Sequence, residues 1–314
     1  MLLRINILIL NFNGKDLLER YLPSFRKAVQ KSHYACRLGV IDNKSTDDSV
    51  HFLEENHPGV DIYLAEKNKV LCSYNDIARE LSEDILIFMN NDIEVKDGFI
   101  DPLIEPFEND PNLFFTAPRA SAHDGSYEGN KTKARIHYGV FWSSDKYPGH
   151  LKDVERTGPT FQAGYGAFDR GKFLTLGGYD DLYLPGTVED ADVCFRAYKK
   201  GWHCLYVPKS VVYHQGRASF YKVFGVEQTR VINWRNTFLF MWKNLGDKIN
   251  FFEFVAWLPF RCAYFFLTGQ YEFFIGFWQA LRLWPEARKR RRELKQSNDW
   301  GRVSDKVIFE ISCP

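Results

Sequence analysis

Short, largely apolar runs recur along the first third of the chain, and segments with helical spacing of apolar positions lie between them. The runs are residues 5–10, 36–42, 60–66 and 85–89. The predicted helices are residues 16–31, 45–56 and 73–82. Nearly continuous apolar runs are typical of strands buried on both faces of a parallel sheet. Strands that alternate with helices indicate a doubly wound α/β fold, in which ligands bind beyond the carboxyl ends of the strands.

Polar side chains follow three of these runs at the point where each strand ends. The clusters are Asn11-Phe12-Asn13, Asp42-Asn43 and Asn90-Asn91-Asp92. Turn chemistry explains any one of them, because Asn and Asp are common loop residues. Three clusters at one edge of a sheet favour a binding crevice instead. The helix after Asp42 is predicted to begin at Ser45, with Asp48 three residues further on in a capping-box arrangement.

The sequence has no Gly-x-Gly-x-x-Gly motif after the first run and no P-loop motif, so a glycine-rich phosphate loop is not predicted. A carboxylate at a strand end is another way to handle phosphate. It holds a divalent cation through oxygen ligands, and the cation neutralises a diphosphate. Asp92 is the candidate for that role.

Two adjacent carboxylates, Glu189 and Asp190, precede a segment predicted to be an amphipathic helix with Arg196 and Lys199 on its polar face. Acidic residues at a helix N-terminus often only stabilise the helix dipole. Adjacent carboxylates also raise each other's proton affinity, as a general base requires. His214 has two interpretations as well, because it is either a lone surface histidine or a metal ligand.

Taken in order, these motifs resemble the inverting glycosyltransferases of family 2, and within it the bacterial rhamnosyltransferase-like branch. The motifs are "NFNG" at 11–14, "IDNKSTDDS" at 41–49, "MNND" at 89–92, "VEDADVCFRAYKKGW" at 188–202 and "VVYH" at 211–214. The resemblance extends over residues 5–220. It implies a GT-A fold, that is, a Rossmann-like, mixed but mainly parallel sheet flanked by helices.

The resemblance implies a role for each matching residue of the donor site. Asp42 matches the acid that binds the nucleobase or ribose of a nucleotide sugar, and Asn11 and Asn13 line the same pocket. Asp92 matches the carboxylate that bridges Mn²⁺ or Mg²⁺ to the diphosphate, and His214 matches a further metal ligand. Two more residues are expected in the nucleotide site, Asn68 and Asn91.

Asp190 matches the catalytic base of the family, with Glu189 beside it. A further segment matches the acceptor site of the family and consists of Gly164, Tyr165, Gly166 and Ala167. The expected reaction moves a sugar from a nucleotide-diphosphate sugar of the dTDP-rhamnose or UDP-hexose type. The expected acceptor is a hydroxyl group of a glycan or lipid-linked sugar in the synthesis of bacterial surface polysaccharide.

Two other classes of protein are weighed against this reading of the motifs. Only one carboxylate, Asp92, remains in the "NND" motif, which leaves open a catalytically silent nucleotide-sugar-binding scaffold of the same fold. Nucleotidyltransferases share a similar α/β core. They begin with a glycine-rich loop that contains Arg, and "LNFNGKD" at 10–16 lacks it.

Composition narrows the choice of partners and compartment. The 41 basic and 40 acidic residues give a net charge of +1, so no basic field predicts nucleic-acid binding. Six cysteines without a Cys-x-x-Cys pair argue against a zinc site or a disulfide framework and favour the cytoplasm. The first residues are too short an apolar stretch, interrupted by Arg4 and Asn6, to predict a signal peptide.

Residues 251–284 contain fourteen aromatic side chains, and charged residues and Pro259 interrupt them too often for a membrane span. Helical spacing places their polar residues on one arc, opposite a broad aromatic face, which predicts one amphipathic helix or two. That face either packs on protein or lies on the inner membrane surface, where Trp and Tyr are favoured. The basic run 288–292 favours the cytoplasmic face of the plasma membrane. The candidate membrane-associating residues are Trp257, Phe265, Trp278, Arg290 and Arg291.

The domain prediction follows these boundaries. Residues 1–95 form the nucleotide-sugar half of the GT-A domain and residues 96–222 its acceptor-binding and catalytic half. Residues 223–296 form a helical, membrane-associating region. Residues 297–314 form a tail with a short strand at 307–311, and a homodimer is left open.

Overall fold

A ten-stranded mixed sheet forms the centre of the molecule. The computed structural model describes residues 3–214, 218–296 and 300–312. The main path of the sheet has the order β10-β12-β6-β11-β4-β1-β2-β3, and β5 and β7 pair with β12 and β6 beside it. The strands are β1 (Ile5–Asn11), β2 (Cys36–Asp42), β3 (Asp61–Leu64), β4 (Ile85–Asn90), β5 (Ile93–Val95), β6 (Leu113–Ser121), β7 (Tyr127–Gly129), β8 (Lys133–His137), β9 (Val140–Ser144), β10 (Gly158–Pro159), β11 (Gly166–Asp169) and β12 (His203–His214).

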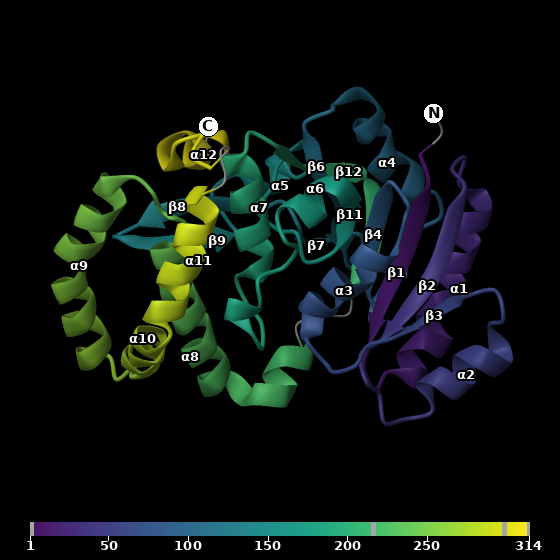
Figure 1. Cartoon of the computed structure of the whole chain (residues 1–314), viewed down its shortest axis with the longest axis horizontal. Helices are drawn as coiled ribbons and strands as arrows, with labels where there is room; N and C mark the ends of the chain where they lie inside the picture. Colours follow the sequence, from purple (N-terminus) through teal and green to yellow (C-terminus); the bar gives the residue numbers. More distant parts are fainter. Residues whose placement is uncertain (1–2, 215–217, 297–299, 313–314) are drawn as a thin grey trace.

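Helices cover the sheet and continue beyond it (Figure 1). The helices are α1 (Lys15–Lys31), α2 (Ser49–Asn56), α3 (Ser73–Glu80), α4 (Ile100–Asn109), α5 (His150–Asp153), α6 (Arg170–Thr175), α7 (Glu189–Lys199), α8 (Ala218–Asn244), α9 (Lys248–Leu267), α10 (Glu272–Arg282), α11 (Trp284–Gln296) and α12 (Asp305–Ser312). Two short 3₁₀ helices are η1 (Val70–Cys72) and η2 (Asp181–Tyr183). Strands β1 to β3 with α1 and α2 occupy one end of the molecule, and α9 occupies the other.

The first half of the sheet is parallel, as the apolar runs predict. β1 pairs with β2 and β4, and β2 pairs with β3, all in parallel. The register places Asn11 opposite Asp42 and Leu10 opposite Asn90, so the polar clusters end at the same edge. The predicted alternation of strands and helices in this half is confirmed, and β3 is a short, partly exposed edge strand.

The second half of the sheet is mixed because β11 is inserted antiparallel between β4 and β6. Gly166 makes this pairing possible, since a Cβ there would lie 2.2 Å from the carbonyl oxygen of Thr116. The aromatic side chains of Phe88, Phe168 and Phe173 pack together on one face of this junction. The sheet is therefore continuous from the donor-site strands to β12.

Two predicted elements are wrong in detail. α2 begins at Ser49 rather than Ser45, because Ser45 lies in the strand-end loop and makes its hydrogen bonds there. The predicted strand at 307–311 is part of helix α12. The Asp305 carboxylate at the start of α12 is buried and accepts hydrogen bonds from the backbone N–H groups of Gly246 and Asp247, which anchors the tail.

Helix α7 is buried on nearly all sides, so the predicted amphipathic helix is also wrong. The Arg196 and Lys199 side chains, which were expected on a polar face, are 2% and 3% exposed. Each is paired with a carboxylate in the interior, Arg196 with Asp192 and Lys199 with Asp305. Buried charges are tolerated only when they are paired and hydrogen-bonded, and these are.

The C-terminal helices form a separate layer at one side of the sheet. α10 and α11 pack on α8, around an aromatic cluster that includes Trp234, Phe238, Phe265 and Phe273. The aromatic region 251–284 divides at Thr268, which confirms the prediction of a pair of helices. Within the described residues, no helix combines the length and the apolar character that crossing a bilayer requires.

Candidate active site

The carboxyl ends of β1, β2 and β4 bring three of the predicted donor-site residues into one polar cluster. Asn91 Nδ2 donates to Asn11 Oδ1 at 2.7 Å, and Asn11 Nδ2 donates to Asp42 Oδ2 at 3.4 Å. Asn11 and Asp42 are buried. Gly14 leaves room for this contact, because a Cβ there would lie 2.1 Å from Asn91 Nδ2. The cluster forms the floor of the strand-end edge.

Ser45 joins the loops that follow β1 and β2. Its Oγ accepts a hydrogen bond from the backbone N–H of Asn13 at 2.9 Å, and its own N–H donates to Asp42 Oδ1 at 2.9 Å. Asn13 has a left-handed backbone with φ of 49° and accepts from the N–H of Thr46 at 2.7 Å. These bonds hold the loops in place, with Asn13 exposed at the rim.

Asn68 reaches the cluster through Asn43. Asn43 Nδ2 donates to Asn68 Oδ1 at 2.8 Å, and Ser73 Oγ donates to Asn43 Oδ1 at 2.6 Å. The same Asn68 oxygen accepts from the N–H of Val70 at 2.9 Å. Asn68 therefore fixes the start of η1 beside the strand ends.

Asp92 and His214 meet because β5, which follows Asp92, pairs antiparallel with β12, with Ile93 opposite His214. Asp92 Oδ1 lies 3.3 Å from His214 Nε2. This oxygen is buried and, among the described residues, has no hydrogen-bond donor. A buried carboxylate oxygen without a donor, beside an imidazole nitrogen, is a donor set that suits a divalent cation.

The described part of the chain contains no cluster of three or more His, Cys, Asp or Glu residues that could hold a metal ion. Two protein ligands leave several coordination positions for phosphate oxygens and water, as is common where a cation binds with a nucleotide. Asp92 and His214 thus fit Mn²⁺ or Mg²⁺ held jointly by the protein and a diphosphate.

Asp190 and Glu189 open α7 and line different spaces. Asp190 lines a cavity of about 450 Å³, whereas Glu189 lines a small hollow beside η1. Burial raises the pKa of Asp190 to about 6. Burial and the neighbouring Asp190 charge raise the pKa of Glu189 to about 8. At neutral pH Glu189 therefore keeps the proton of the pair, and Asp190 is the ionised carboxylate.

Two groups support the charge on Asp190. Its Oδ1 accepts a hydrogen bond from the backbone N–H of Ala191 at 2.8 Å. The Gln162 side chain also hydrogen-bonds this carboxylate and holds its pKa below the value that burial alone would give. Gln162 lines the same cavity. Asp190 is thus oriented toward a space large enough for a sugar.

The turn that presents Asp190 is strained. Thr187 and Val188 both have left-handed backbones, with φ of 72° and 73°, which β-branched residues rarely adopt. Asn236 of α8 holds the turn, because its Nδ2 lies within hydrogen-bond distance of the carbonyl oxygens of Tyr183 at 2.7 Å, Gly186 at 2.6 Å and Thr187 at 3.1 Å. Strained backbone of this kind occurs at functional sites and needs such support.

A buried ionic network lies behind the turn. Asp192 of α7 pairs with Arg196 at 2.6 Å and with Lys243 of α8 at 2.8 Å. Lys243 also pairs with Asp180 at 2.5 Å, and Asp180 pairs with Arg290 of α11 at 2.7 Å. These opposite charges hold the pKa of Asp192 and Asp180 below their usual range. The network fixes α7 to the C-terminal helices.

The walls of the Asp190 cavity come from elements far apart in the sequence. Helix α8 and the β8–β9 hairpin supply most of them, and α9 closes one side. The remaining lining residues are His137, Val140, Phe141, Trp142, Ser143, Gln162, Val188, Ala191, Asn233, Trp234, Thr237 and Arg261. None of these was predicted as a site residue, although Val188 and Ala191 lie in the motif at 188–202. The lining residues of α8, α9 and the hairpin reach Asp190 only through the packing of these elements.

The predicted acceptor segment lies elsewhere. The structure buries Gly164, Tyr165, Gly166 and Ala167, and Gly166 and Ala167 pair with β4 inside the sheet. None of the four lines the Asp190 cavity. Tyr165 packs against His214 with ring centroids 5.5 Å apart, so the acceptor role of this segment stays a prediction. Gly166 and Ala167 are held in place by their pairing with β4, whereas Gln162, two residues before the segment, lines the cavity.

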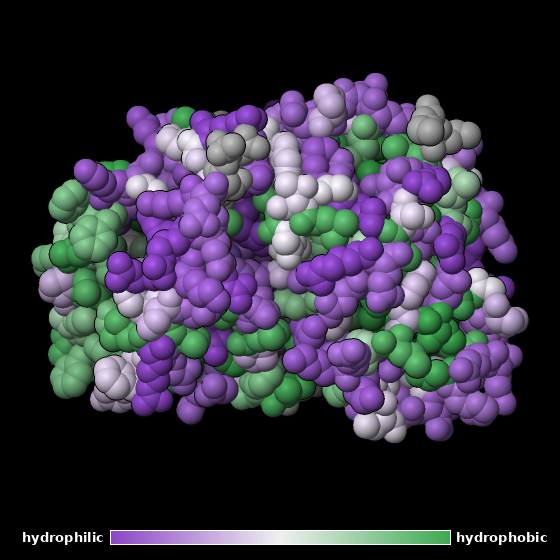
Figure 2. Space-filling view, viewed as in Figure 1, coloured by the Kyte–Doolittle hydropathy of each residue, from purple (hydrophilic) through white to green (hydrophobic). Residues whose placement is uncertain are grey.

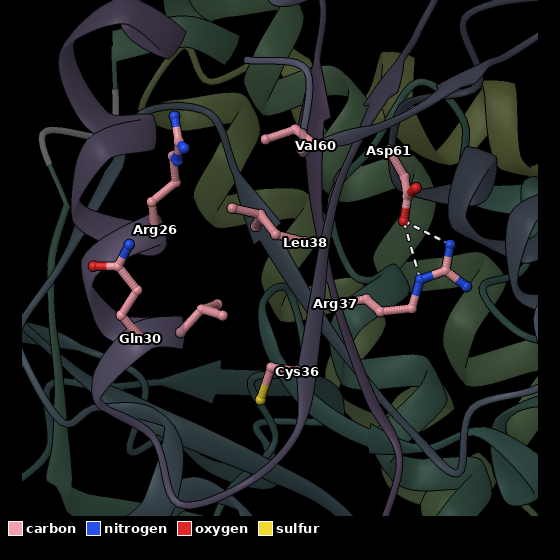
Figure 3. Close-up of a pocket in the computed structure, with 9 residues that line it drawn as sticks. Arg26, Gln30, Cys36, Arg37, Leu38, Val60 and Asp61 are labelled. Atoms are coloured by element: carbon pink, nitrogen blue, oxygen red, sulfur yellow. Dashed lines mark hydrogen bonds and ion pairs between the residues drawn. The ribbon is translucent and has the colours of Figure 1, made fainter.

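A second cavity of about 350 Å³ lies between α1, β2 and β3 (Figure 3). Its lining begins at Cys36, the first residue of β2, so it lies at the opposite edge of the sheet from the strand-end cluster. The Arg37 and Asp61 side chains there are already paired at 2.8 Å. We therefore place the active site at the carboxyl ends of the strands.

The predicted membrane-associating residues divide into two groups. Trp257 and Trp278 are 38% and 59% exposed. Phe265 is 7% exposed and packs against Trp234 and Phe273, so it belongs to the core and is corrected.

Arg290 and Arg291 point inward, which corrects their expected role as contacts for lipid. Arg290 forms ion pairs with Asp180 and Asp181, both at 2.7 Å. Arg291 donates to the carbonyl oxygen of Trp242 at 3.0 Å. Both belong to the basic run 288–292, but the sequence does not show which side of α11 faces the protein.

Comparison with known proteins identifies relatives of about half to two thirds of the chain. A putative polypeptide N-acetylgalactosaminyltransferase 10 of Drosophila melanogaster is 27% identical over 161 residues, 49% of this chain and 25% of the relative. An N-acetylglucosaminyl-diphospho-decaprenol L-rhamnosyltransferase of Mycobacterium tuberculosis is 25% identical over 222 residues, 63% of this chain and 71% of the relative. The chain thus spans about a quarter of the length of the Drosophila protein.

Solved structures show the same fold. GalNAc-T7 with UDP, GalNAc and Mn²⁺ aligns with a TM-score of 0.58 at 18% identity over 76% of this chain and 48% of that chain. The mannosyltransferase PcManGT of Pyrobaculum calidifontis, in complex with GDP-Man and Mn²⁺, aligns with a TM-score of 0.52 at 14% identity over 95% of this chain and 76% of that one. These likenesses confirm the GT-A fold.

The family assignment comes from the sequence itself. The family model for Glycosyl transferase family 2 matches residues 6–177, more than half of the chain. The matched part contains the strand-end cluster and Asp92, and it ends just before the turn that presents Asp190. This chain belongs to glycosyl transferase family 2.

Proposed function

We propose that the chain is a metal-dependent inverting glycosyltransferase that moves a sugar from a nucleotide-diphosphate sugar to a hydroxyl group of an acceptor. The observation that carries the proposal is the placement of Asp190. It is an ionised carboxylate, oriented by Gln162, in a cavity of about 450 Å³. Glu189, on the other side of the same turn, lies beside η1 and the donor-site loops.

The chemistry is a single displacement. Asp190 accepts the proton of the acceptor hydroxyl group while the hydroxyl oxygen attacks the anomeric carbon of the donor. The bond from that carbon to the diphosphate oxygen breaks, the nucleoside diphosphate leaves with the electron pair, and the configuration at the carbon inverts. A Mn²⁺ or Mg²⁺ ion held by Asp92 and His214 supplies positive charge opposite the leaving diphosphate when bound.

The donor we favour is of the dTDP-rhamnose or UDP-hexose type, and the acceptor is a glycan or lipid-linked sugar of bacterial surface polysaccharide. The mycobacterial relative, which this chain matches over most of that protein's length, is named for rhamnosyl transfer to a lipid diphosphate sugar. Among the structural neighbours, GalNAc-T7 was solved with UDP. Asp42, buried at the end of β2, is placed to bind the base or ribose.

The direct test is a panel of UDP-, dTDP- and GDP-sugars with Mn²⁺, with Mg²⁺ and with a chelator. We expect metal-dependent binding and slow hydrolysis of one donor, with binding lost in Asp92→Ala. Release of a nucleoside diphosphate identifies a transferase, whereas formation of a nucleotide sugar identifies a nucleotidyltransferase. Binding of a donor that is never hydrolysed or transferred supports the silent scaffold instead, and binding of none refutes the proposal.

We also propose that α9 lies on the cytoplasmic surface of the plasma membrane. Its polar side chains face the protein, where Glu253 Oε1 accepts from the N–H of Gly139 and Arg261 donates to the β8–β9 turn. Its outer side carries large apolar residues that are at least 57% exposed, namely Phe251, Phe252, Phe260, Tyr264, Phe266 and Leu267. Figure 2 shows hydrophobic residues along this end of the molecule. Such a face suits the interfacial region of a bilayer.

Exposed cations accompany this face. Lys248 lies at the start of α9, and Arg282 lies at the end of α10 with its guanidinium 5.5 Å from the Trp278 ring. Flotation with vesicles that contain anionic lipid tests the proposal. We expect the wild-type protein to float with the vesicles and the double variant Phe260→Glu/Phe266→Glu to remain in the fraction that does not float. If the wild-type protein does not float but forms a dimer that this variant disrupts, the face binds a second copy instead.

A further inference from the structure

Arg261 is the one cation that α9 directs into the Asp190 cavity among the residues described as lining it. Its Nε donates to the carbonyl oxygen of Tyr138 at 2.8 Å, and its Nη2 donates to that of His137 at 2.7 Å. These bonds fix the guanidinium against the turn of the β8–β9 hairpin. They leave Nη1 without a hydrogen-bond partner among the described residues.

No described carboxylate pairs with Arg261. Burial lowers its pKa, and no nearby acid offsets that effect. Arg290 differs in this respect, since it lies between Asp180 and Asp181. Arg235 resembles Arg261 in that burial lowers its pKa, but it does not line the cavity. A partly buried cation without a counter-ion is unfavourable. Such a cation, held in fixed geometry at the wall of an enzyme cavity, is a ready site for an anion.

The surroundings of Arg261 include a titratable imidazole. His137 lines the same cavity, and its pKa is lowered by burial and by the charges of Arg135 and Arg261. Glu253 is the acid that acts in the opposite direction on His137. Its Oε1 accepts from the backbone N–H of Gly139, on the hairpin turn. His137 is therefore neutral at neutral pH, and Arg261 is the cationic donor among the described lining residues of the cavity.

We propose that Arg261 is the subsite for a phosphate group of the acceptor. The proposal rests on the proposed function, in which Asp190 activates the acceptor hydroxyl group. Asp190 and Arg261 line one cavity, so a sugar phosphate that fills it presents its hydroxyl group to Asp190 and its phosphate to the guanidinium. A lipid attached to that phosphate leaves the cavity over α9, whose outer side is the exposed aromatic face.

A structural role for Arg261 predicts a different outcome. If it only holds the hairpin turn, Arg261→Gln should retain much of its function, because the Gln amide also donates to a carbonyl oxygen. If it binds phosphate, the same change removes the charge that the ligand needs. Arg20→Gln is the matched control, since Arg20 is an exposed cation of α1 that neither lines the cavity nor belongs to the proposed membrane face.

Binding of farnesyl diphosphate, without donor, tests the subsite independently of turnover. Calorimetric titration should give about 10- to 100-fold weaker binding to Arg261→Gln than to the wild-type protein, the loss expected for a hydrogen bond to a charged group. Arg20→Gln should bind like wild type, and farnesol should bind wild type and Arg261→Gln equally. Equal binding of farnesyl diphosphate to wild type and Arg261→Gln overturns the proposal, as does no binding to wild type.

A kinetic comparison separates this proposal from the proposed function. The probes are N-acetylglucosaminyl diphosphate with a short prenyl chain and the matched prenyl glycoside without the diphosphate. Arg261→Gln should raise KM about 10- to 100-fold for the first and leave KM for the second unchanged. If Asp190→Asn loses transfer, the proposed transferase is supported. If Arg261→Gln then has the same ratio of KM for the diphosphate to KM for the glycoside as wild type, the phosphate subsite is overturned. If farnesyl diphosphate binds in a way that depends on Arg261 but no nucleotide sugar is bound, hydrolysed or transferred, the phosphate subsite is supported and the proposed transferase is overturned.

Discussion

Asp92 Oδ1 lies 3.3 Å from Nε2 of His214, although the two residues end strands in different halves of the sheet. The antiparallel pair of β5 and β12 creates this contact. The family model ends at residue 177, so it includes Asp92 but not its partner. The contact therefore joins the matched half of the chain to the half that supplies Asp190.

The first prediction concerns these two residues. Asp92→Ala and His214→Ala should each weaken Mn²⁺-dependent donor binding, because the cation loses one of two protein ligands. Losses on the order of 10- to 100-fold in metal affinity are typical even for residues that only support a metal ligand, so the effect should be at least that large. Titration of Mn²⁺ against donor binding measures it.

The control for this pair is Glu94→Gln. Glu94 lies two residues after Asp92 but pairs with His123 at 3.5 Å, outside the site. It should leave the metal titration unchanged. If Asp92→Ala needs the same Mn²⁺ concentration for donor binding as wild type, Asp92 is not a metal ligand.

The second prediction separates the two carboxylates of α7. Asp190→Asn should lower kcat by about 10²- to 10⁴-fold and leave donor affinity nearly intact, because the base is lost. Glu189→Gln should cost much less, since Glu189 with its pKa raised to about 8 is already protonated at neutral pH. Steady-state kinetics of both variants decide the assignment, and a reversed order would make Glu189 the base.

The third prediction is the pH profile. The base acts in its ionised form, so kcat/KM should fall as the pH drops through about 6, the pKa to which burial raises Asp190. The decline should approach tenfold per pH unit below that value. A profile that stays flat down to pH 5 would contradict the role of Asp190.

The fourth prediction links Glu189 to stability. The folded protein binds a proton at Glu189 up to about pH 8, whereas an unfolded chain releases it near the ordinary pKa of 4.5. Between these values the folded state holds more protons, so the free energy of unfolding falls as the pH rises. Glu189→Gln removes this dependence. The melting temperature of Glu189→Gln, relative to that of wild type, should therefore rise from pH 5 to pH 8. A difference in melting temperature that stays constant over this range would refute the raised pKa of Glu189.

The fifth prediction concerns Asn236, which is fully buried. Asn236→Ala removes the donor shared by the carbonyl oxygens of Tyr183, Gly186 and Thr187. The loss should lower the free energy of unfolding by about 1–3 kcal/mol. It should lower kcat more than donor affinity, because the strained turn presents Asp190. Urea denaturation and kinetics measure both, with exposed Gln228→Ala on the same helix as the control.

The sequence predicted those parts of the fold that depend on local patterns. β1, β2 and β4 are buried on both faces, so their apolar runs are continuous and their ends are marked by Asn and Asp. Asp92, His214 and Asp190 lie in short motifs at strand or helix ends, and their roles stay predictions from the family resemblance. The family assignment and the GT-A fold are confirmed.

The parts that the sequence did not predict depend on contacts between distant residues. Serine often caps helices, but the Ser45 hydroxyl oxygen instead accepts a hydrogen bond from the backbone N–H of Asn13, in the loop after β1. Arg196 and Lys199 have helical spacing typical of an exposed face, but Asp192 and Asp305 neutralise them in the interior. Arg261 lies on the polar arc predicted for the aromatic region, but only the packing of α9 on the hairpin shows that it lines the Asp190 cavity.

The network of Asp180, Asp192 and Lys243 also determines how the chain can be divided or recombined. A chain cut after residue 222 would keep both carboxylates and lose the lysine. Asp180 would then lose its pairs with Lys243 and Arg290, and Asp192 would keep only Arg196, directly behind the turn that presents Asp190. Chimeras that exchange the C-terminal helices for those of a relative must therefore transfer the two acids and the lysine together.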